Sequence, residues 1–387
     1  MQAERYIKMI NFQKKEWPAL STEAEISAYY PDGQVPEYHV IIRLTDTTIN
    51  AAEQFQRTEA TIRLLREHLP ETVLVWKRYF VSDAVNQSGF INSSDHNAAV
   101  SIIQQPPLDG TKVAVWLYFV PNIQLTKNDQ CTIMEHSSYR HLFHTQLFSL
   151  GADETAQTDA LFNQYIQFLE NQKCTLSDNC MRTWVFVQNV DTHYTGMVVA
   201  RRKCFESEGL TKDTHFIAST GIEGKYINPD VLVFMDALAV QGIQSEQIQY
   251  LYAPTHLNPT HQYGVTFERG TAIQYGNRRH VYISGTASIN NRGEIEHPLD
   301  LIKQTDRMFE NIRSLLTEAD TDMNDVMHLI VYLRDIADYD TIALYMKQNY
   351  PQIPQIIVWA PVCRPGWLIE AECMAIKGIS DKQFADF

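Results

Sequence analysis

The stretch DLIKQTDRMFENIRSLLTEADTDMNDVMHLIVYLRDI, residues 300–336, decides the fold. Its first half carries apolar residues at helical spacing, namely Ile302, Met308, Phe309, Ile312, Leu315 and Leu316. Its second half contains VMHLIVYLRDI, an apolar run of strand length. A helix followed by a strand is the elementary unit of a layered α/β domain.

The same helix-and-strand pattern occurs twice more in the 387-residue chain. Residues 153–172 place Leu161, Phe162, Tyr165, Ile166 and Leu169 at helical spacing before MRTWVFVQNVD, and residues 50–69 place Phe55, Ile62, Leu65 and Leu69 before ETVLVWKRYFVSD. Each copy closes with two further strand-like segments, within 100–120, 216–240 and 354–376. The agreement of these endings favours an internal repeat over three helices that resemble one another by chance.

We therefore predict an α/β protein built from three degenerate copies, each with a sheet covered on one face by two helices. The expected organisation is an N-terminal extension at 1–35 and three units at 36–125, 137–245 and 260–380. The Thr/His/Asn/Pro-rich segment APTHLNPTHQYG is expected to be the linker to the last unit.

Composition excludes several classes of partner. A formal charge of −14 repels phosphate backbones, and no Lys/Arg run interleaves with aromatic residues, so nucleic acid is not an expected partner. The N-terminal residues lack the apolar core of a signal peptide, and no apolar run reaches 18 residues, so we expect a soluble, cytoplasmic protein without membrane contact. The six cysteines form no CxxC pair, which favours free thiols; a Cys174–Cys180 pair is the alternative.

Metal and nucleotide cofactors are not expected either. The histidines of HSSYRHLFH, His136, His141 and His144, are spaced so that they do not share one face of a strand, and no paired Cys or acidic ligand accompanies them. No GxxxxGK[ST] or GxGxxG motif occurs.

The stretch VCRPGWLIEAE, residues 362–372, carries Glu370 and Glu372 on one face of a predicted strand. Superposing the three closing strands puts Glu370 opposite Ala114 and Phe234, so only the last copy keeps a carboxylate at this position. The next position on that face, Glu372, matches Trp116 and Asp236, which makes it the weaker candidate for a unique role.

Apolar neighbours should raise the pKa of Glu370, because desolvation disfavours the charged form of a carboxyl group. A carboxyl that stays protonated near neutral pH can serve as a general acid. The alternative is an edge-strand carboxylate that faces water.

Several of these stretches resemble the RidA (YjgF) family: VYISGTASI followed by an amphipathic helix, VYLRDIADYD, and the terminal IEAE, over roughly 260–380. Members of that family are typically trimers with ligand sites between subunits, so the resemblance implies a pseudo-trimer within one chain. A monomer is then expected, with a homo-oligomer as the alternative. Imine deaminases of that family bind the substrate carboxylate through an arginine in a proline–arginine step, whereas the matching PQII here has Gln355.

Five motifs in order resemble the chorismatases, a branch of the same superfamily, over about 180–378: MRTWVFVQNVD, ASTGIEGK, QYGVTFERG, ISGTASI followed by GEIEHPLD, and VCRPGWLIEAE. The resemblance implies an enzyme that releases pyruvate from chorismate without a cofactor. Chorismate carries an enol ether whose terminal methylene must accept a proton before the C–O bond breaks. By the family pattern, Glu370 supplies that proton.

The two carboxylates of chorismate are best held by arginine, whose planar fork donates two parallel hydrogen bonds. The candidates are Arg269 and Arg182, with Arg364 after them; surface arginines are the alternative. Further candidate contacts are the phenol of Tyr263 and the Thr220–Gly221 step, while Ser284–Thr286 is expected to be structural.

Two positions separate the branches of that family by product, and here they are Gly270 and Cys363. This pair resembles the branch that forms 3-hydroxybenzoate, in which the ring hydroxyl rather than water displaces pyruvate. Hydrolysis to a dihydroxycyclohexadienoate, a RidA-type imine deaminase and a non-catalytic protein that binds a small carboxylic acid are the alternatives.

Overall fold

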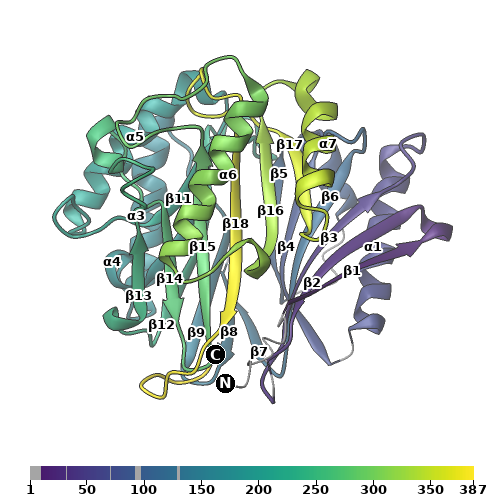
Figure 1. Ribbon diagram of the computed structural model, residues 1–387, viewed down its shortest axis with the longest axis horizontal. Helices are drawn as coiled ribbons and strands as arrows, with labels where there is room; N and C mark the ends of the chain where they lie inside the picture. The colour runs from purple at the N-terminus through teal and green to yellow at the C-terminus, as the bar shows by residue number, and fades with distance from the viewer. Residues whose placement is uncertain (1–9, 32, 70, 92–96, 129–130) are drawn as a thin grey trace, which may run out of the picture.

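The chain forms three six-stranded sheets with one and the same strand order (Figure 1). The computed structural model describes residues 10–31, 33–69, 71–91, 97–128 and 131–387. In each unit three antiparallel strands lead into a long helix, and two parallel strands and a closing strand complete the sheet. The predicted α/β class and the three-unit pseudo-trimer are confirmed.

The elements of the first unit, in sheet order, are β1 (Ile10–Trp17), β2 (Thr22–Tyr29), β3 (Glu37–Leu44), β6 (Val113–Pro121), β4 (Thr72–Val81) and β5 (Ala99–Gln104), with helices α1 (Ala51–His68) and α2 (Ala84–Gln87). Those of the second unit are β7 (Gln124–Asn128), β8 (Cys131–His136), β9 (Tyr139–Phe148), β12 (Val233–Gln241), β10 (Cys180–Val187) and β11 (Ala218–Glu223), with α3 (Glu154–Asn171), α4 (Leu176–Asn179) and α5 (Val190–Ser207). Those of the third unit are β13 (Ile248–Leu251), β14 (Gly270–Gln274), β15 (Arg278–Ala287), β18 (Ile369–Gly378), β16 (Val326–Leu333) and β17 (Gln355–Trp359), with α6 (Leu301–Glu318) and α7 (Tyr339–Asn349).

The main helices α1, α3 and α6 are each 18 residues long and begin in the same way. Asn50, Asp153 and Asp300 stand at their N-caps, and each side chain accepts a hydrogen bond from the backbone N–H three residues on. The predicted apolar face of α6 is buried except for Ile302, which is 39% exposed because it stands on the first turn of the helix.

The unit limits differ from those expected, because each unit begins earlier in the chain. Residues 10–29 form β1 and β2 of the first sheet rather than an extension, and β7, β8 and β13 precede the expected starts at 137 and 260. The expected linker, residues 253–264, therefore lies inside the third unit, between β13 and β14. These outer strands are rich in exposed or half-exposed polar residues, so their apolar periodicity is weak.

Two helices cover the sheets of units 2 and 3, as predicted, but in unit 1 the second helix is reduced to the four-residue α2. Helix α5, by contrast, is extended to 18 residues. This extension brings side chains of unit 2 to the edge of unit 3.

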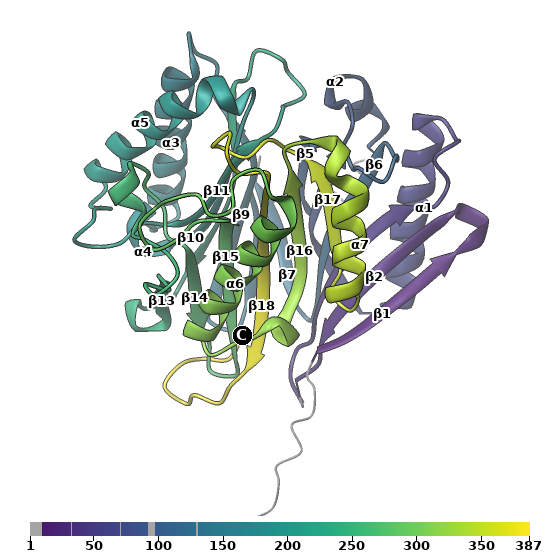
Figure 2. The same ribbon diagram turned by 45° about the horizontal axis from the view of Figure 1, so that its top comes forward.

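The three sheets face one another at the centre of the molecule, and the helices lie outside them (Figure 2). Trp76, Trp116 and Trp184 meet there with ring centroids 5.8 to 6.5 Å apart. The guanidinium of Arg78 stacks on this cluster, 4.4 Å from the Trp184 ring. One hydrophobic core thus runs through all three units.

All six cysteines are free. The histidines of residues 136–144 pack against aromatic rings: His136 and His141 both contact Phe387, whereas His144 contacts Phe168. Within the described residues, no group of His, Cys, Asp or Glu side chains is arranged to hold a metal ion, and no helix has the length and apolar character needed to cross a bilayer.

Candidate active site

The register of the closing strands agrees with the superposition made from the sequence. In each sheet the closing strand pairs antiparallel with the strand that follows the main helix. At equivalent places the paired residues are Phe80 with Ala114, Phe186 with Phe234, and Tyr332 with Glu370. Glu370 therefore has no acidic counterpart in the other two units.

Glu370 lies in a pocket between units 2 and 3. Its exposed fraction is 5%. Unit 2 contributes Tyr194, Arg201, Ser219 and Gly221, and unit 3 contributes Val265, Phe267, Arg269, Gly285, Ala287, Ile289, Cys363, Arg364, Trp367 and Glu370. A cleft between two units is where the resemblance led us to expect a ligand site.

Burial raises the pKa of Glu370 to about 8. The negative charge of Glu372 adds to the rise, while the guanidinium groups of Arg269 and Arg182 oppose it. At neutral pH the carboxyl group is accordingly protonated, and it can donate a proton to a bound molecule.

The Glu370 carboxyl rests against the backbone of β15 at Gly285. A Cβ at this position would lie 2.1 Å from Oε1 of Glu370 and 3.0 Å from Cγ2 of Thr220. A side chain at this position would therefore push the Glu370 carboxyl group away from its present place.

Three arginines surround the acid: Arg269 and Arg364, both predicted, and Arg201, which the sequence reasoning missed. Arg269 donates through Nη2 to the backbone oxygen and to Oδ1 of Asn258, both at 3.2 Å. Arg201, 1% exposed, donates through Nη1 to Oγ of Ser219 at 3.4 Å. Among the described lining residues Glu370 is the one acid, so the pocket has a local excess of positive charge.

A signal for Arg201 was present in the sequence. It stands four residues after Met197 and four before Phe205, both buried, so helical spacing places it on the inner face of α5. A charged residue on a buried helix face marks a partner or a ligand.

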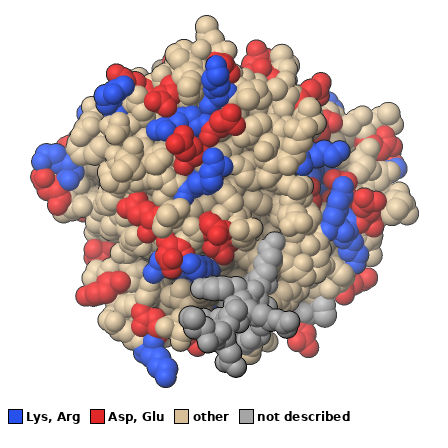
Figure 3. Space-filling view, in the orientation of Figure 1, with Lys and Arg blue, Asp and Glu red and all other residues tan. Residues whose placement is uncertain are grey.

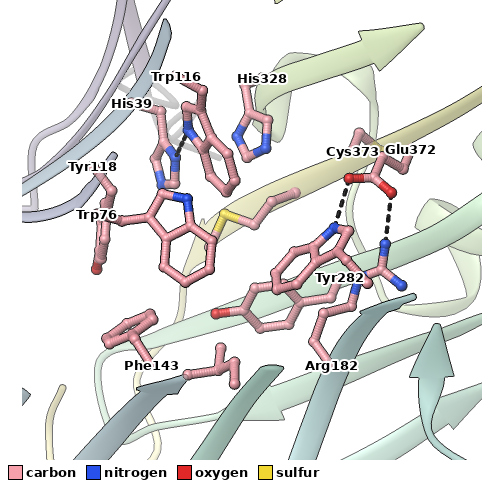
Figure 4. Close-up of a pocket in the computed structure, with 13 residues that line it drawn as sticks. His39, Trp76, Trp116, Tyr118, Phe143, Arg182, Tyr282, His328, Glu372 and Cys373 are labelled. Atoms are coloured by element: carbon pink, nitrogen blue, oxygen red, sulfur yellow. Dashed lines mark hydrogen bonds and ion pairs between the residues drawn. The ribbon is translucent and has the colours of Figure 1, made fainter. Parts of the chain in front are cut away.

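Arg182 does not line this pocket. It ion-pairs with Glu372 at 2.8 Å in a second, mainly aromatic cavity at the centre of the molecule (Figure 4). Strand alternation on β10 gives Arg182 and Trp184 the same direction, toward the other two sheets. Thr220 also faces Glu372, to which its hydroxyl donates, whereas Gly221 lines the Glu370 pocket.

Of the remaining residues predicted from the sequence, some line the pocket and others do not. Cys363 lines the pocket, and burial raises the pKa of its thiol to about 12, so it is not a ready nucleophile. Gly270 does not line it, because a Cβ there would face Leu251 and Ile283. The side chain of Tyr263 lies outside the described part of the structure. Ser284 is structural as expected, since it accepts from the Ser219 N–H and donates to the Glu268 carbonyl.

Gln355, which the sequence matches to the deaminase arginine, lies against unit 1 and does not line the Glu370 pocket. It contacts Glu25 and Arg43 of unit 1. The strand position of unit 2 that is equivalent to Gln355 holds Ser219, on β11 beside Glu370. The hydroxyl of Ser219 accepts a hydrogen bond from the Arg201 guanidinium. A guanidinium is therefore present near the acid, but it comes from a helix.

The position of Glu370 is occupied differently in the other two units. Around Phe234, the rings of Phe186 and Tyr226 lie 4.9 and 5.2 Å away. In unit 1 the equivalent residue is Ala114. Neither side chain can transfer a proton.

Comparison with known proteins agrees with this architecture. The family model described as Endoribonuclease L-PSP matches residues 269–377. A RutC family protein of Pyrococcus abyssi is 33% identical over 109 residues, which are 27% of this chain and 84% of that protein. The 3-aminoacrylate deaminase RutC of Acinetobacter baylyi is 29% identical over 97 residues, 24% of this chain and 77% of that protein.

Among solved structures, a crystal structure of a chorismatase is similar to 78% of this chain and 92% of its own chain, with a TM-score of 0.63 and 18% sequence identity. At that identity the similarity concerns the fold. It covers a larger share of this chain than the two sequence relatives do, which cover 27% and 24% of it.

Proposed function

The chain belongs to the RutC family through its C-terminal unit, and from this premise we propose that it is an enzyme that cleaves chorismate and releases pyruvate. The observation that carries the proposal is Glu370, a buried and protonated carboxyl group in a pocket lined by three arginines. The fold shared with a chorismatase supports the same substrate.

The substrate is a dianion, and the pocket supplies positive charge from two sides. Arg201 comes from α5 of unit 2, while Arg269 and Arg364 come from unit 3. We assign Arg201 and Arg269 to the two carboxylates, since both guanidiniums are almost fully buried and so act in a low dielectric. Arg182 is not assigned to a substrate carboxylate, because its guanidinium already forms an ion pair with Glu372.

The reaction begins with proton transfer from Glu370 to the terminal methylene of the enol ether. The carbon of the former double bond becomes an oxocarbenium ion, and the Glu370 carboxylate left behind stabilises this cation. Cleavage of the ether then releases pyruvate. A buried acid suits this step because the same apolar wall that keeps it protonated strengthens its later attraction to the cation.

We further propose 3-hydroxybenzoate as the product. If the neighbouring ring hydroxyl displaces pyruvate, chorismate is converted into 3-hydroxybenzoate and pyruvate, and no water is consumed. If a water molecule attacks instead, the ring product is a dihydroxycyclohexadienoate. Cys363, which lines the pocket with a neutral thiol, supports the first outcome by occupying space that a water molecule would need.

The test is incubation of the purified protein with chorismate, with pyruvate measured through lactate dehydrogenase and the ring product separated by chromatography. Glu370→Gln should abolish pyruvate release. Glu268→Gln is the matched control, because Glu268 is also buried, with its pKa raised to about 7, but lines a neighbouring pocket. Absence of pyruvate above background, or full activity of Glu370→Gln, would refute the proposal.

A second candidate is an enamine or imine deaminase, which the relative named 3-aminoacrylate deaminase favours. That activity would use the carboxyl group of Glu370 and the guanidinium of Arg201, which line the same pocket. Ammonia release from an enamine acid, without pyruvate release from chorismate, would establish it. Stabilisation by chorismate without turnover by either route would indicate a binding protein.

A further inference from the structure

Glu372 is enclosed by hydrogen-bond donors of unit 2. Its Oε2 accepts from Arg182 Nη2 at 2.8 Å (Figure 4). Its oxygens also accept from Trp184 Nε1 at 2.7 Å and from Thr220 Oγ1 at 2.5 Å. The side chain is 3% exposed. Three donors, one of them a guanidinium, form the environment of an ionised carboxylate.

Glu372 is linked to Glu370 in two ways. Both side chains leave β18 on the same face, two residues apart, which is about 7 Å along a strand. In addition, Thr220 Oγ1 accepts the N–H of Gly285 at 2.9 Å, and Gly285 is the residue against which the Glu370 carboxyl rests. The hydroxyl that binds one glutamate therefore also fixes the backbone beneath the other.

We propose that Glu372 is a positioning residue of the active site, a fixed negative charge held by Arg182 that keeps the neighbouring Glu370 in its proton-donating form. The inference deepens the proposed function and rests on it for its kinetic readout. Two carboxylates this close in a buried site resist simultaneous ionisation, and Glu372 is the one that has the donors. Among the charged groups, Glu372 acts most strongly in raising the pKa of Glu370.

The other groups around Glu370 act against Glu372 or are neutral. The positively charged groups are Arg182 on β10, Arg201 on α5, Arg269 just before β14 and Arg364 before β18. The neutral titratable groups are Tyr332 on β16, Tyr194 on α5 and Cys363 before β18. Because the guanidiniums of Arg269 and Arg182 lower the pKa of Glu370, this carboxyl group would ionise more readily without the charge of Glu372.

The test is the pH dependence of pyruvate release in Glu372→Gln. The activity of the wild type should fall as pH rises through the pKa of the acid; in the variant this fall should move to lower pH by about one pH unit or more. Glu37→Gln is the matched control, since Glu37 is also a fully buried carboxylate, pairs with Arg278 at 2.6 Å and does not line the Glu370 pocket. It should leave the midpoint in place, even where it lowers stability.

Infrared difference spectroscopy supplies a readout that does not need turnover. The carbonyl band of protonated Glu370, identified by its loss in Glu370→Gln, should titrate at lower pH in Glu372→Gln than in the wild type. This result would support the inference even if chorismate is not the substrate. If Glu372→Gln does not fold, the double variant Arg182→Met/Glu372→Gln removes both charges. The band should shift in the same direction but by less, because Arg182 itself lowers the pKa of Glu370 and acts more weakly than Glu372. An unchanged midpoint in either folded variant would overturn the inference.

Discussion

Gly285 and Glu370 are in such close contact that no side chain fits between them: a Cβ on Gly285 would lie 2.1 Å from Oε1 of the acid. Gly285→Ala should therefore displace the carboxyl group and lower kcat for pyruvate release by about 100-fold, the cost of misplacing a reacting group by roughly 1 Å. Steady-state kinetics measure the loss. Gly89→Ala, at a glycine with nothing within 4 Å of the added Cβ, is the control and should leave kcat unchanged.

The rate should fall as pH rises through about 8, because Glu370 must be protonated to act and its pKa is raised from 4.5 to about 8. Stability should follow the same sign. Between the two values the folded chain holds a proton that the unfolded chain has released, so the free energy of unfolding decreases as pH rises.

Above pH 8 the wild type contains a buried carboxylate that Glu370→Gln lacks. The variant should therefore be the more stable protein at pH 9, by an amount whose upper limit is on the order of 5 kcal/mol. Denaturant titrations at pH 6 and pH 9 test this. Equal stability differences at the two pH values would contradict the raised pKa.

Arg201→Met should lower kcat/KM for chorismate by about 100-fold or more, because a buried guanidinium would no longer meet a substrate carboxylate. Arg201→Lys should recover little of this loss, since an ammonium cannot make two parallel hydrogen bonds. Arg202→Met is the control: Arg202 is the next residue on α5, but it donates to the backbone oxygen of Gly264 instead of lining the pocket. Equal effects at the two arginines would argue against the assignment.

Cys363→Ala should change the product more than the rate. The smaller side chain leaves room for water, so the proportion of dihydroxycyclohexadienoate should rise at the expense of 3-hydroxybenzoate. Cys373→Ala, on β18 but in the central cavity, should leave the product ratio as in the wild type. Chromatography of the ring products after complete turnover gives both ratios.

The chain should be a monomer in solution, because its three units already provide one another with the neighbours that a trimer of single units would supply. Sedimentation velocity at several protein concentrations tests this. A trimer whose activity depends on protein concentration would show that the sites need a second chain.

The repeat and the acid could be predicted from the sequence because both depend on local periodicity. The apolar face of α6 and the alternation of Glu370 with Ile369 and Ala371 are visible without knowledge of any distant residue. The outer strands β1 and β7 have too weak an apolar pattern to be recognised, so the predicted starts of the first two units lie too far along the chain.

Contacts between units could not be predicted in this way. Arg182 stands on a motif that resembles the family, but its partner Glu372 is 190 residues away and in another unit. Arg201 could not be predicted from the strand motifs either. The strand position beside Glu370 holds Ser219, and the guanidinium that contacts this serine belongs to helix α5. The cleft that a residue lines depends on how the three units pack against one another.

Covalent linkage of the three units has a consequence for how such a protein can diverge. In an assembly of identical subunits every substitution appears three times, so a change that improves one cleft alters all of them. Here each unit is encoded separately, and the equivalent strand position holds Phe234 in one unit, Ala114 in another and Glu370 in the third. Loss of symmetry leaves the other two clefts free to become scaffold, and selection on catalysis then acts only on the cleft that contains Glu370.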